Sequence, residues 1–490
     1  MKKILLIEYF LFLFNCLLIS QTVVNFDDFF INRTMRIDYY HIGNAKKEFI
    51  TLDKVYEQGV WAGSTRNLLD HFNNGRYFVK IYDYSTNQMI FSKGFDSYFG
   101  EYKTTTPALK GIKRTYHESI LIPYPKNKII FTIEKRDKNN LLHQIFAQVI
   151  DPNGIDIIRE SPARRVKIFE FLKNGDPHNK VDIVFVAEGY TKKEEKKFSS
   201  DVKRLIKVFF QQEPYKSHKD RFNIWGAFSA SEESGCDEPT YGSYKNTILN
   251  ATFNSLGSQR YLLTEDNKTL RDIISNVPYD AVIILVNTKR YGGGGIYNLY
   301  CTVISDNYWT NYILLHEFGH SFAGLADEYY TSSVAYSEFY PRGIEPVEPN
   351  ITALLDPKNL KWKSLCSSGV KIPTPWEKED FEKMDNEYQK IRRELNKKIA
   401  EMKRKKAPRE EIEKLEEKSD KLSREHAKKI DEFLKRSKNY GIVGAFEGAG
   451  YSAKGLYRSM VDCIMFSKGV KPYCKVCEKA IIRMIEYYSE

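Results

Sequence analysis

Residues Asn311 to Tyr330 read NYILLHEFGHSFAGLADEYY, and the rest of the chain is organised around this stretch. Within it, His316, Glu317 and His320 form the pattern His-Glu-x-x-His. On a helix, positions four apart lie one turn apart on one face, so both imidazoles can reach a single metal ion. Glu317 is placed to take a proton from a metal-bound water, whose pKa zinc lowers to about 7. The pattern predicts a zinc peptidase site with Glu317 as the catalytic base.

The residues around this pattern favour a buried helix over an accidental match on an exposed one. Large apolar side chains recur at spacings of four, four and three, at Leu314, Phe318, Phe322 and Leu325. Gly324 readily takes a positive φ and can end the helix, after which the chain can turn back toward the metal. The whole chain has only 9 histidines, which also argues against chance.

The third metal ligand is less firmly placed by the sequence. In the metzincin pattern a glycine follows the second histidine by three residues, whereas Gly324 follows His320 by four. We favour Asp327, three residues after Gly324, and keep its neighbour Glu328 as the alternative. A thermolysin-like site would use a more distant glutamate, and the candidates are Glu338, Glu345 and Glu348.

Length and charge exclude several classes of function. The chain has 490 residues, enough for two or three domains, and its apolar content of 42% supports real cores. The net charge of +11 is spread along the chain, and no Walker loop, zinc-finger spacing or RNA-binding signature accompanies it. We therefore expect no nucleic-acid partner, and a protein or peptide substrate instead.

The N-terminus reads MKKILLIEYFLFLFNCLLISQT, two lysines followed by a short apolar run. This is typical of a secretory signal peptide, here residues 1–20, with cleavage near Ser20–Gln21. We expect a secreted, periplasmic or cell-surface protein without a stable membrane span. A lipid anchor on Cys16 is the alternative, although Asn15 is a poor match to the small residue such a site prefers.

Residues 21–160 are predicted to form an antiparallel β-sandwich domain. Short β-branched and aromatic runs alternate with turn residues, at Tyr77–Tyr84, Gln88–Phe95, Glu118–Tyr124, Lys128–Arg136 and Ile145–Ile150. The segment Asp151–Arg165, with its prolines and a glycine, is the expected boundary. The domain carries no cluster of catalytic residue types, so it is either a scaffold for the enzyme or a module that binds substrate or a surface.

Residues 161–490 are predicted to form the peptidase domain. Apolar runs at Val181–Ala187, Phe222–Ser229 and Asp280–Asn287 predict strands of a covered sheet, with helices between them. A capping box, Thr191-x-x-Glu194, opens the first of these helices. This alternation of strands and helices leading into the metal-binding helix indicates an α/β or α+β catalytic domain.

Two further segments of this domain stand out. The glycines Gly292–Gly295 are expected to let an edge strand approach the cleft, where it could pair with an extended substrate; a flexible loop is the alternative. Residues 375–437 are predicted to form a charged, antiparallel helical hairpin inserted in the domain, with Thr374 as the first cap and Pro408 restarting the second arm.

The C-terminal part offers further candidate site residues. Met465 is predicted to form an apolar floor under the histidines, with Met460 as its rival. Tyr457 is a candidate for stabilising the transition state by polarising the scissile carbonyl, as is Arg458 beside it; simple packing is the alternative for both.

The six cysteines after the signal peptide permit disulfides, but the sequence alone does not choose among 15 pairings. Cys474-x-x-Cys477 lacks both the βαβ setting of a redox motif and a second CxxC of a zinc ribbon. We expect a structural role for this pair.

These motifs resemble a known family. The segments HEFGHSFAGLADEY, ILVNTKRYGGGGIYN, GAFEGAGY, GLYR, CIM and YCKVC resemble the clostridial-type IgA-peptidase family of secreted zinc metallopeptidases. The resemblance covers most of Val166–Tyr487, and the β-rich part before it looks like the domain that precedes the catalytic one in gut-bacterial members. The hairpin looks unlike the usual core of the family.

The resemblance implies His316 and His320 as zinc ligands, Glu317 as the base and an acidic third ligand best placed at Asp327. It also implies a metzincin-like fold with a methionine turn, best placed at Met465. The expected function is a secreted zinc endopeptidase acting on proteins, with host glycoproteins or immunoglobulin as candidate substrates, although the family name does not show that this chain cuts immunoglobulin A. The alternative is a non-enzymatic surface protein that binds a host protein or glycan and keeps a vestigial metal site.

Overall fold

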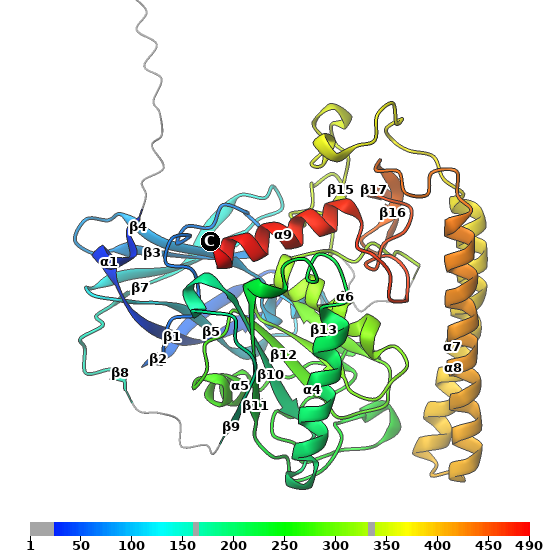
Figure 1. The fold of residues 1–490 in the computed structure, drawn as a ribbon, viewed down its shortest axis with the longest axis horizontal. Helices are drawn as coiled ribbons and strands as arrows, with labels where there is room; N and C mark the ends of the chain where they lie inside the picture. Colours follow the sequence, from blue (N-terminus) through cyan, green and yellow to red (C-terminus); the bar gives the residue numbers. More distant parts are fainter. Residues whose placement is uncertain (1–23, 160–165, 332–338) are drawn as a thin grey trace, which may run out of the picture.

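The computed structural model describes residues 24–159, 166–331 and 339–490, and shows a mixed α+β fold with several sheets (Figure 1). The predicted signal peptide lies outside the described residues, as does Glu338. Within the described residues, no helix is both long enough and apolar enough to cross a bilayer.

The N-terminal part consists of two four-stranded sheets that share one hydrophobic core. Apart from the parallel pair β2–β8, all neighbouring strands are antiparallel. The first sheet has the order β5 (Arg114–Pro125), β1 (Phe30–Gly43), β2 (Glu48–Glu57), β8 (Ile157–Ile158). The second has the order β4 (Met89–Phe95), β3 (Tyr77–Asp83), β6 (Ile129–Arg136), β7 (Leu142–Ile150). Three short helices flank them: α1 (Phe26–Phe29), α2 (Tyr98–Tyr102) and α3 (Thr106–Leu109).

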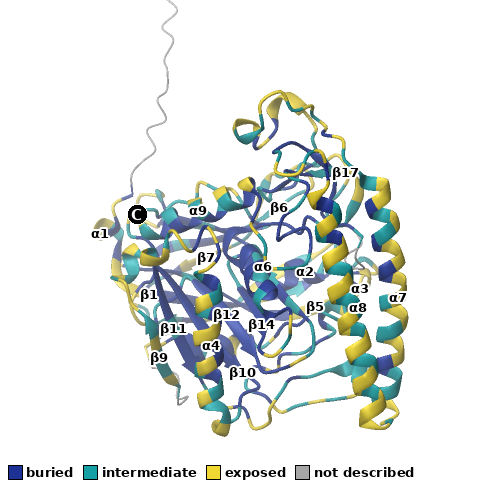
Figure 2. Ribbon diagram, turned by 45° about the vertical axis from the view of Figure 1, so that its right-hand side comes forward, coloured by how far each residue is buried: buried dark blue, intermediate teal, exposed yellow. Residues whose placement is uncertain are grey.

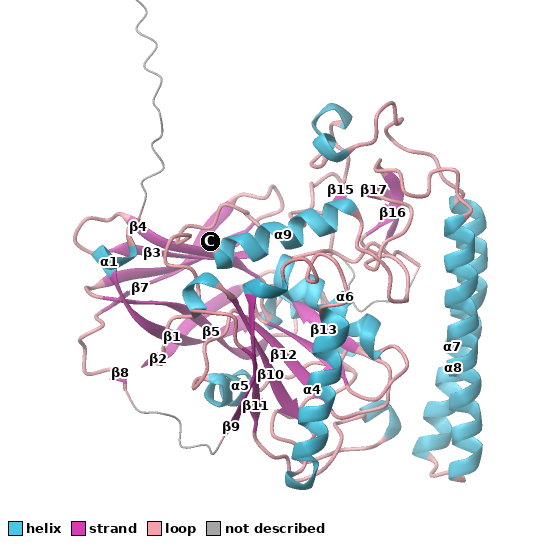
Figure 3. Cartoon of the chain, in the orientation of Figure 1, coloured by secondary structure: helices cyan, strands magenta, loops and turns pink. Residues whose placement is uncertain are grey.

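A six-stranded sheet forms the centre of the C-terminal part (Figure 3). Its order is β13 (Gly293–Ile296), β14 (Tyr300–Ile304), β12 (Ala281–Val286), β10 (Val181–Glu188), β11 (Phe222–Phe228), β9 (Lys167–Leu172). The four inner strands are parallel and almost wholly buried, while the two edge strands run antiparallel. Continuous apolar runs suit strands that are covered on both faces.

Four helices pack around this sheet: α4 (Glu195–Phe209), α5 (Asn267–Ile274), α6 (Thr310–Ala323) and α9 (Lys475–Ser489). α6 lies against β13 and β14 and also contacts α4 and α9. Its predicted stripe is buried, and Phe318 stacks on Phe322 with ring centroids 5.0 Å apart. His316, Glu317 and His320 therefore lie on a helix that is held in the core.

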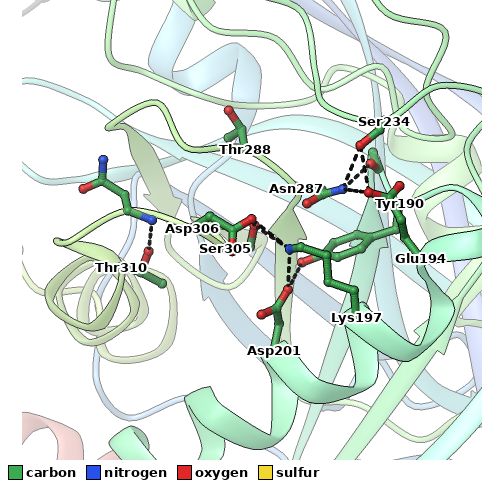
Figure 4. A network of polar contacts seen from close by, with 12 residues as sticks. Tyr190, Glu194, Lys197, Asp201, Ser234, Asn287, Thr288, Ser305, Asp306 and Thr310 are labelled. Carbon is green, nitrogen blue, oxygen red and sulfur yellow. Dashed lines mark hydrogen bonds and ion pairs between the residues drawn. The ribbon is translucent and has the colours of Figure 1, made fainter. Parts of the chain in front are cut away.

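A polar network lies at the carboxyl ends of the parallel strands of the six-stranded sheet (Figure 4). Lys197 on α4 bridges Asp201 and Asp306, each at 2.8 Å, and Asp306 follows β14. Asn287, which follows β12, donates to Glu194 at 3.0 Å. These contacts tie α4 to the residues that follow β12 and β14.

The two parts of the chain are joined by buried polar contacts. Arg36 on β1 pairs with Asp38 at 2.6 Å on its own strand and with Asp272 on α5 at 2.7 Å. Asn267, also on α5, donates to Ser119 on β5 at 2.8 Å. The first N-terminal sheet therefore packs on the helix that precedes β12.

α7 (Lys378–Arg404) and α8 (Arg409–Lys435) lie antiparallel along the outside of the molecule, with their outer faces exposed (Figure 2). Tyr388 stacks on His426 at 3.8 Å between centroids, across the helix pair. The prediction that Thr374 caps α7 is wrong: α7 begins at Lys378, and the Thr374 hydroxyl accepts from Ala445 N at 3.0 Å instead. The three-stranded sheet beside the helices contains β15 (Ile351–Thr352), β16 (Phe446–Ala449) and β17 (Ser452–Arg458).

Candidate active site

The two histidines of α6 converge as their spacing predicts. Their Nε2 atoms lie 3.2 Å apart, and the rings meet nearly at right angles. Both side chains are largely buried, with 5% of the His316 side chain and 14% of the His320 side chain exposed. The pair presents two nitrogen atoms to one point in a cavity.

Gly324 turns the chain back toward these nitrogens. It ends α6 at a φ of 61°, and its N–H donates to His320 O at 3.0 Å. Asp327 thereby reaches both rings: its Oδ1 lies 3.0 Å from His316 Nε2 and 3.2 Å from His320 Nε2. Two nitrogens and one carboxylate oxygen form a nearly equilateral triangle.

Backbone carbonyls orient the imidazoles. His316 Nδ1 lies 3.1 Å from Ile464 O, and His320 Nδ1 lies 2.5 Å from Leu325 O. A carbonyl only accepts, so each Nδ1 carries a proton, and each Nε2, which faces Asp327, is the ring atom that can bind a metal ion. Histidines that bind metals usually donate their other ring N–H to a carbonyl or carboxylate in this way, which fixes the orientation of the ring.

The donor triangle fits zinc. Bonds of about 2.0–2.1 Å arranged tetrahedrally around zinc place neighbouring ligand atoms about 3.3 Å apart. The three edges here, 3.0, 3.2 and 3.2 Å, are close to that value. Three protein ligands leave one tetrahedral position for water or substrate, as in catalytic zinc sites.

The charges of this triangle also favour a cation. Burial lowers the pKa of His320, but the charge of Asp327 outweighs burial and raises that pKa to about 9. Burial raises the pKa of Asp327, but the two histidines hold it well below its usual range. The second carboxylate oxygen of Asp327 accepts from the Tyr451 hydroxyl at 2.5 Å, which fixes its orientation.

Glu317 faces the same cavity, beside strand β13. A Cβ on Gly293 would lie 3.2 Å from Glu317 Cγ, and a Cβ on Gly295 would lie 2.4 Å from Glu317 O. Only glycine lets the edge strand run this close to α6. Burial raises the pKa of Glu317, partly offset by the charges of His316 and His320.

The outer edge of the glycine strand is already paired at Gly293, the first residue of β13. Gly293 N donates to Arg260 O at 3.3 Å, and Gly293 O accepts from Leu262 N at 3.2 Å. The segment at residues 260–262 therefore occupies the backbone groups that an extended substrate would need at Gly293.

The cavity around the triangle draws its walls from both parts of the chain. Among its lining residues, the N-terminal part contributes Arg76, Asp96 and Glu101. Arg260 and Tyr329 line it from the C-terminal part, and the Arg260 guanidinium donates to the Tyr329 hydroxyl at 2.8 Å. The N-terminal part thus reaches the site directly.

Comparison with protein families identifies the chain. Residues 169–485 match the family IgA Peptidase M64, and residues 25–147 match Peptidase M64 N-terminus. The chain belongs to the IgA peptidase M64 family. A comparison with curated proteins gave no match. The resemblance read from the motifs is confirmed, and membership of the M64 family implies a peptidase that acts on protein substrates.

The structure places the other predicted residues of this M64 peptidase as follows. Met465 is fully buried, and its sulfur lies 3.2 Å from a Cβ placed on Gly319, one residue before His320. Glu328 points away from the histidines, with its Oε1 3.3 Å from Cys477 Sγ. Of the distant glutamates, Glu348 lines the cavity and accepts from Tyr340 at 3.2 Å, while Glu345 accepts from Ala353 N at 3.0 Å.

Tyr457 does not line the cavity around the donor triangle. It lies on β17, opposite Thr352 and Glu447 in the small sheet. Tyr451, at the turn before β17, reaches Asp327 instead. Tyr451, Arg260 and Tyr329 were not predicted as site residues, because their proximity to the histidines depends on long-range packing. Two of them did lie in quoted motifs: Tyr329 in the stretch around the histidines and Tyr451 at the end of GAFEGAGY.

Proposed function

We propose that this M64 peptidase is a zinc-dependent endopeptidase, with His316, His320 and Asp327 as the zinc ligands. The near-equilateral triangle of their donor atoms carries the proposal. Zinc, when bound, would supply Lewis-acid polarisation of the scissile carbonyl and lower the pKa of a water to about 7. The buried Met465 beneath α6 supports a metzincin-like methionine turn.

Glu317 acts as the general base and then as the general acid. It accepts a proton from the attacking water as the oxygen adds to the peptide carbon, and it passes that proton to the leaving amine when the C–N bond breaks. Burial raises the pKa of its carboxyl, which suits a group that must release a proton as well as accept one. General acid–base catalysis contributes about 10²–10⁴-fold to such rates.

Arg260 and Tyr329 are better placed than Tyr457 to stabilise the developing oxyanion. Both line the cavity, and the Tyr329 ring stacks parallel to His316 at 6.3 Å between centroids. The Arg260 guanidinium donates a hydrogen bond to the Tyr329 hydroxyl. Its positive charge therefore makes that hydroxyl a stronger hydrogen-bond donor to an oxyanion.

Substrate is a peptide segment of a protein that enters the cavity between the two parts of the chain. Arg76, Asp96 and Glu101 give the N-terminal wall both signs of charge. We propose that the protein is exported by its N-terminal signal peptide and meets its substrates outside the cytoplasm. Family membership favours this enzyme over a non-enzymatic binding protein.

Incubation of the purified protein with a diverse peptide library tests the proposal. We expect internal peptide bonds to be cut, cleavage to stop on treatment with a chelator, and activity to return when zinc is added to the stripped protein. Cleavage that persists after complete removal of divalent metal would refute the proposed zinc dependence.

A further inference from the structure

A second group of side chains that could hold a metal ion lies next to the triangle of His316, His320 and Asp327. It consists of Glu328, Cys463, Cys474 and Cys477, hereafter the cysteine cluster. All four side chains are buried, and one ligand atom from each lies within 4.8 Å of the others. The three cysteines come from one C-terminal stretch, residues 463–477, whereas Glu328 lies 146 positions before Cys474.

Local structure presents the sulfurs to one point. Cys474 caps α9 and Cys477 lies in its first turn; the Cys477 N–H donates to Cys474 Sγ at 3.4 Å. Cys463 Sγ accepts from the backbone N–H groups of Cys474 at 3.2 Å and Met465 at 3.4 Å. The Ser459 hydroxyl adds a contact of 3.1 Å to Cys474 Sγ. Donors directed at sulfur stabilise thiolates that hold a metal.

Distances within the cluster match a tetrahedral zinc site. With Zn–S bonds of about 2.3 Å and a Zn–O bond of about 2.0 Å, sulfur–sulfur edges are about 3.8 Å and sulfur–oxygen edges about 3.5 Å. Cys463 Sγ lies 3.9 Å from Cys477 Sγ. Glu328 Oε1 lies 3.6 Å from Cys474 Sγ and 3.3 Å from Cys477 Sγ.

A disulfide accounts for the cluster less well. The two sulfurs at 3.9 Å are far beyond the bond length of about 2.05 Å, and the six described cysteines are all free. Any single disulfide within the cluster would leave one thiol unpaired and would not account for the buried carboxylate of Glu328. Glu328 is fully buried, and its Oε2 has no hydrogen-bond partner among the residues that the structure describes. An enclosed carboxylate of this kind needs a cation or a proton to balance its charge.

We propose that the cysteine cluster is a second zinc site, closed by three thiolates and one carboxylate. Thiolate-rich tetrahedral sites favour zinc, and a site with four protein ligands has no open position for substrate. The buried guanidinium of Arg458 lies nearby and interacts electrostatically with Glu328, which offsets part of the excess negative charge of such a site.

A metal ion in the cysteine cluster would also stabilise the positions of His316 and Asp327. Glu328 directly follows Asp327, and its N–H donates to Met465 O at 2.9 Å. Cys463 is one residue from Ile464, whose carbonyl orients His316. This stabilising role rests on the proposed function, whereas the metal site itself does not. A single ion would hold the chain segments that position Asp327 and His316.

Cobalt substitution of the full chain tests the site. Thiolate-bound Co²⁺ gives an intense sulfur-to-cobalt charge-transfer band in the near ultraviolet, which a site of two histidines and one aspartate does not. We expect the wild-type protein to bind about two metal equivalents and to show that band. The variant His316→Ala/His320→Ala should bind about one equivalent and keep the band.

Variants that lack cysteines of the cluster should lose the charge-transfer band instead. Cys463→Ser/Cys477→Ser should bind about one equivalent and lose the band, whereas Cys366→Ser, which alters a cysteine outside the cluster, should match the wild type. Wild-type protein that binds cobalt without the band, or in which Cys463, Cys474 or Cys477 is found in a disulfide after unfolding without reductant, would overturn the proposal. Because the band of the wild type and the histidine variant is decisive, the test stands if the cysteine variants do not fold. Failure of the catalytic zinc proposal would leave the band in place.

Discussion

The hydroxyl of Tyr451 fixes the orientation of Asp327, the proposed third zinc ligand. Its bond to the outer oxygen of Asp327 leaves the inner oxygen directed at both histidines. Outer-shell partners of this type are worth about 10–100-fold in metal affinity or activity. The triangle therefore depends on a residue 124 positions away in sequence.

Tyr451→Phe should weaken zinc binding at the histidine site about 10–100-fold while leaving the fold intact. Competition with a chromophoric chelator measures the affinity. Tyr457→Phe is the matched control, because Tyr457 lies outside the cavity lining, and it should bind zinc as the wild type does. Equal loss in both variants would show that Tyr451 has no special link to the metal.

Gly295→Ala should damage the site by overpacking. The added Cβ would lie 2.4 Å from Glu317 O and 2.9 Å from His320 Cβ, so β13 or α6 must move. We expect a loss of about 1–3 kcal/mol in the free energy of unfolding and a clear fall in kcat/KM. Gly59→Ala, where the new Cβ would lie no closer than 3.7 Å to a neighbour, should change neither quantity appreciably. An active, stable Gly295→Ala protein would contradict the proposed role of the glycine strand.

The paired helices α7 and α8 are attached to the loop that follows the site. Asp385 on α7 accepts from the Thr331 hydroxyl, which follows Tyr330, and lies 2.6 Å from His426 Nε2 on α8. Burial raises the pKa of Asp385, but the bonds to His426 and Thr331 outweigh burial and lower it. One buried carboxylate thus joins both helices to the metal-binding segment.

Asp385→Ala should lower the free energy of unfolding by about 1–3 kcal/mol, because it leaves buried donors without an acceptor. Urea denaturation measures the change. Asp380→Ala, on the exposed face of the same helix, is the control and should cost much less. Similar losses in both variants would mean that the Thr331–Asp385–His426 contact does not fasten the helices.

Several elements follow from the sequence because local chemistry determines them. The spacing of His316 and His320, the buried stripe and Gly324 predict α6 and its end, and apolar runs predict the parallel strands. β1 and β2 were not among the predicted strands. In β1 the apolar residues Met35 and Ile37 alternate with Arg36 and Asp38, a pattern that predicts one polar, exposed face. Arg36 and Asp38 are nevertheless fully buried, because they pair with each other and Arg36 also pairs with Asp272 of α5.

Other features depend on contacts that no local pattern encodes. Thr374 has the residue type of a helix cap, but a backbone N–H of the segment before β16 uses its hydroxyl. Cys474-x-x-Cys477 appeared incomplete as a metal motif because Cys463 and Glu328 join it only in the folded chain. Tyr451, Arg260 and the N-terminal wall of the cavity are brought to the site in the same way.

Buried charge at the junction of the two parts gives the whole molecule a pH dependence. The Asp182 N–H donates to the Asp280 carboxylate and the Asp280 N–H donates to Asp182 O, where Asp182 lies on β10 and Asp280 just before β12. Asp280 also interacts with the half-buried Lys93 of β4. Burial raises the pKa of Asp182 from 3.8 to about 7, against the hydrogen bonds from Trp225 and Asn223 that lower it. The folded state therefore holds a proton that the unfolded chain has lost.

Stability should accordingly fall as pH rises from about 4 through about 7, because the folded protein binds more protons over that range. Asp182→Asn mimics the neutral acid, so its stability should depend less on pH, by about 2–4 kcal/mol over that range. Urea denaturation at several pH values tests this, with the exposed Asp156→Asn as control. If the free energy of unfolding of Asp182→Asn depended on pH as that of the wild type does, the pH dependence would not come from Asp182.

Zinc content and peptide cleavage, measured on the same preparations of wild type and Glu317→Gln, test the central claim most directly. Glu317→Gln should bind as much zinc as the wild type and cleave peptides at least about 100-fold more slowly, because it keeps the three ligands and loses the base. Glu317→Gln protein that cleaves at the wild-type rate, or wild-type protein that cleaves without metal at His316, His320 and Asp327, would contradict the account.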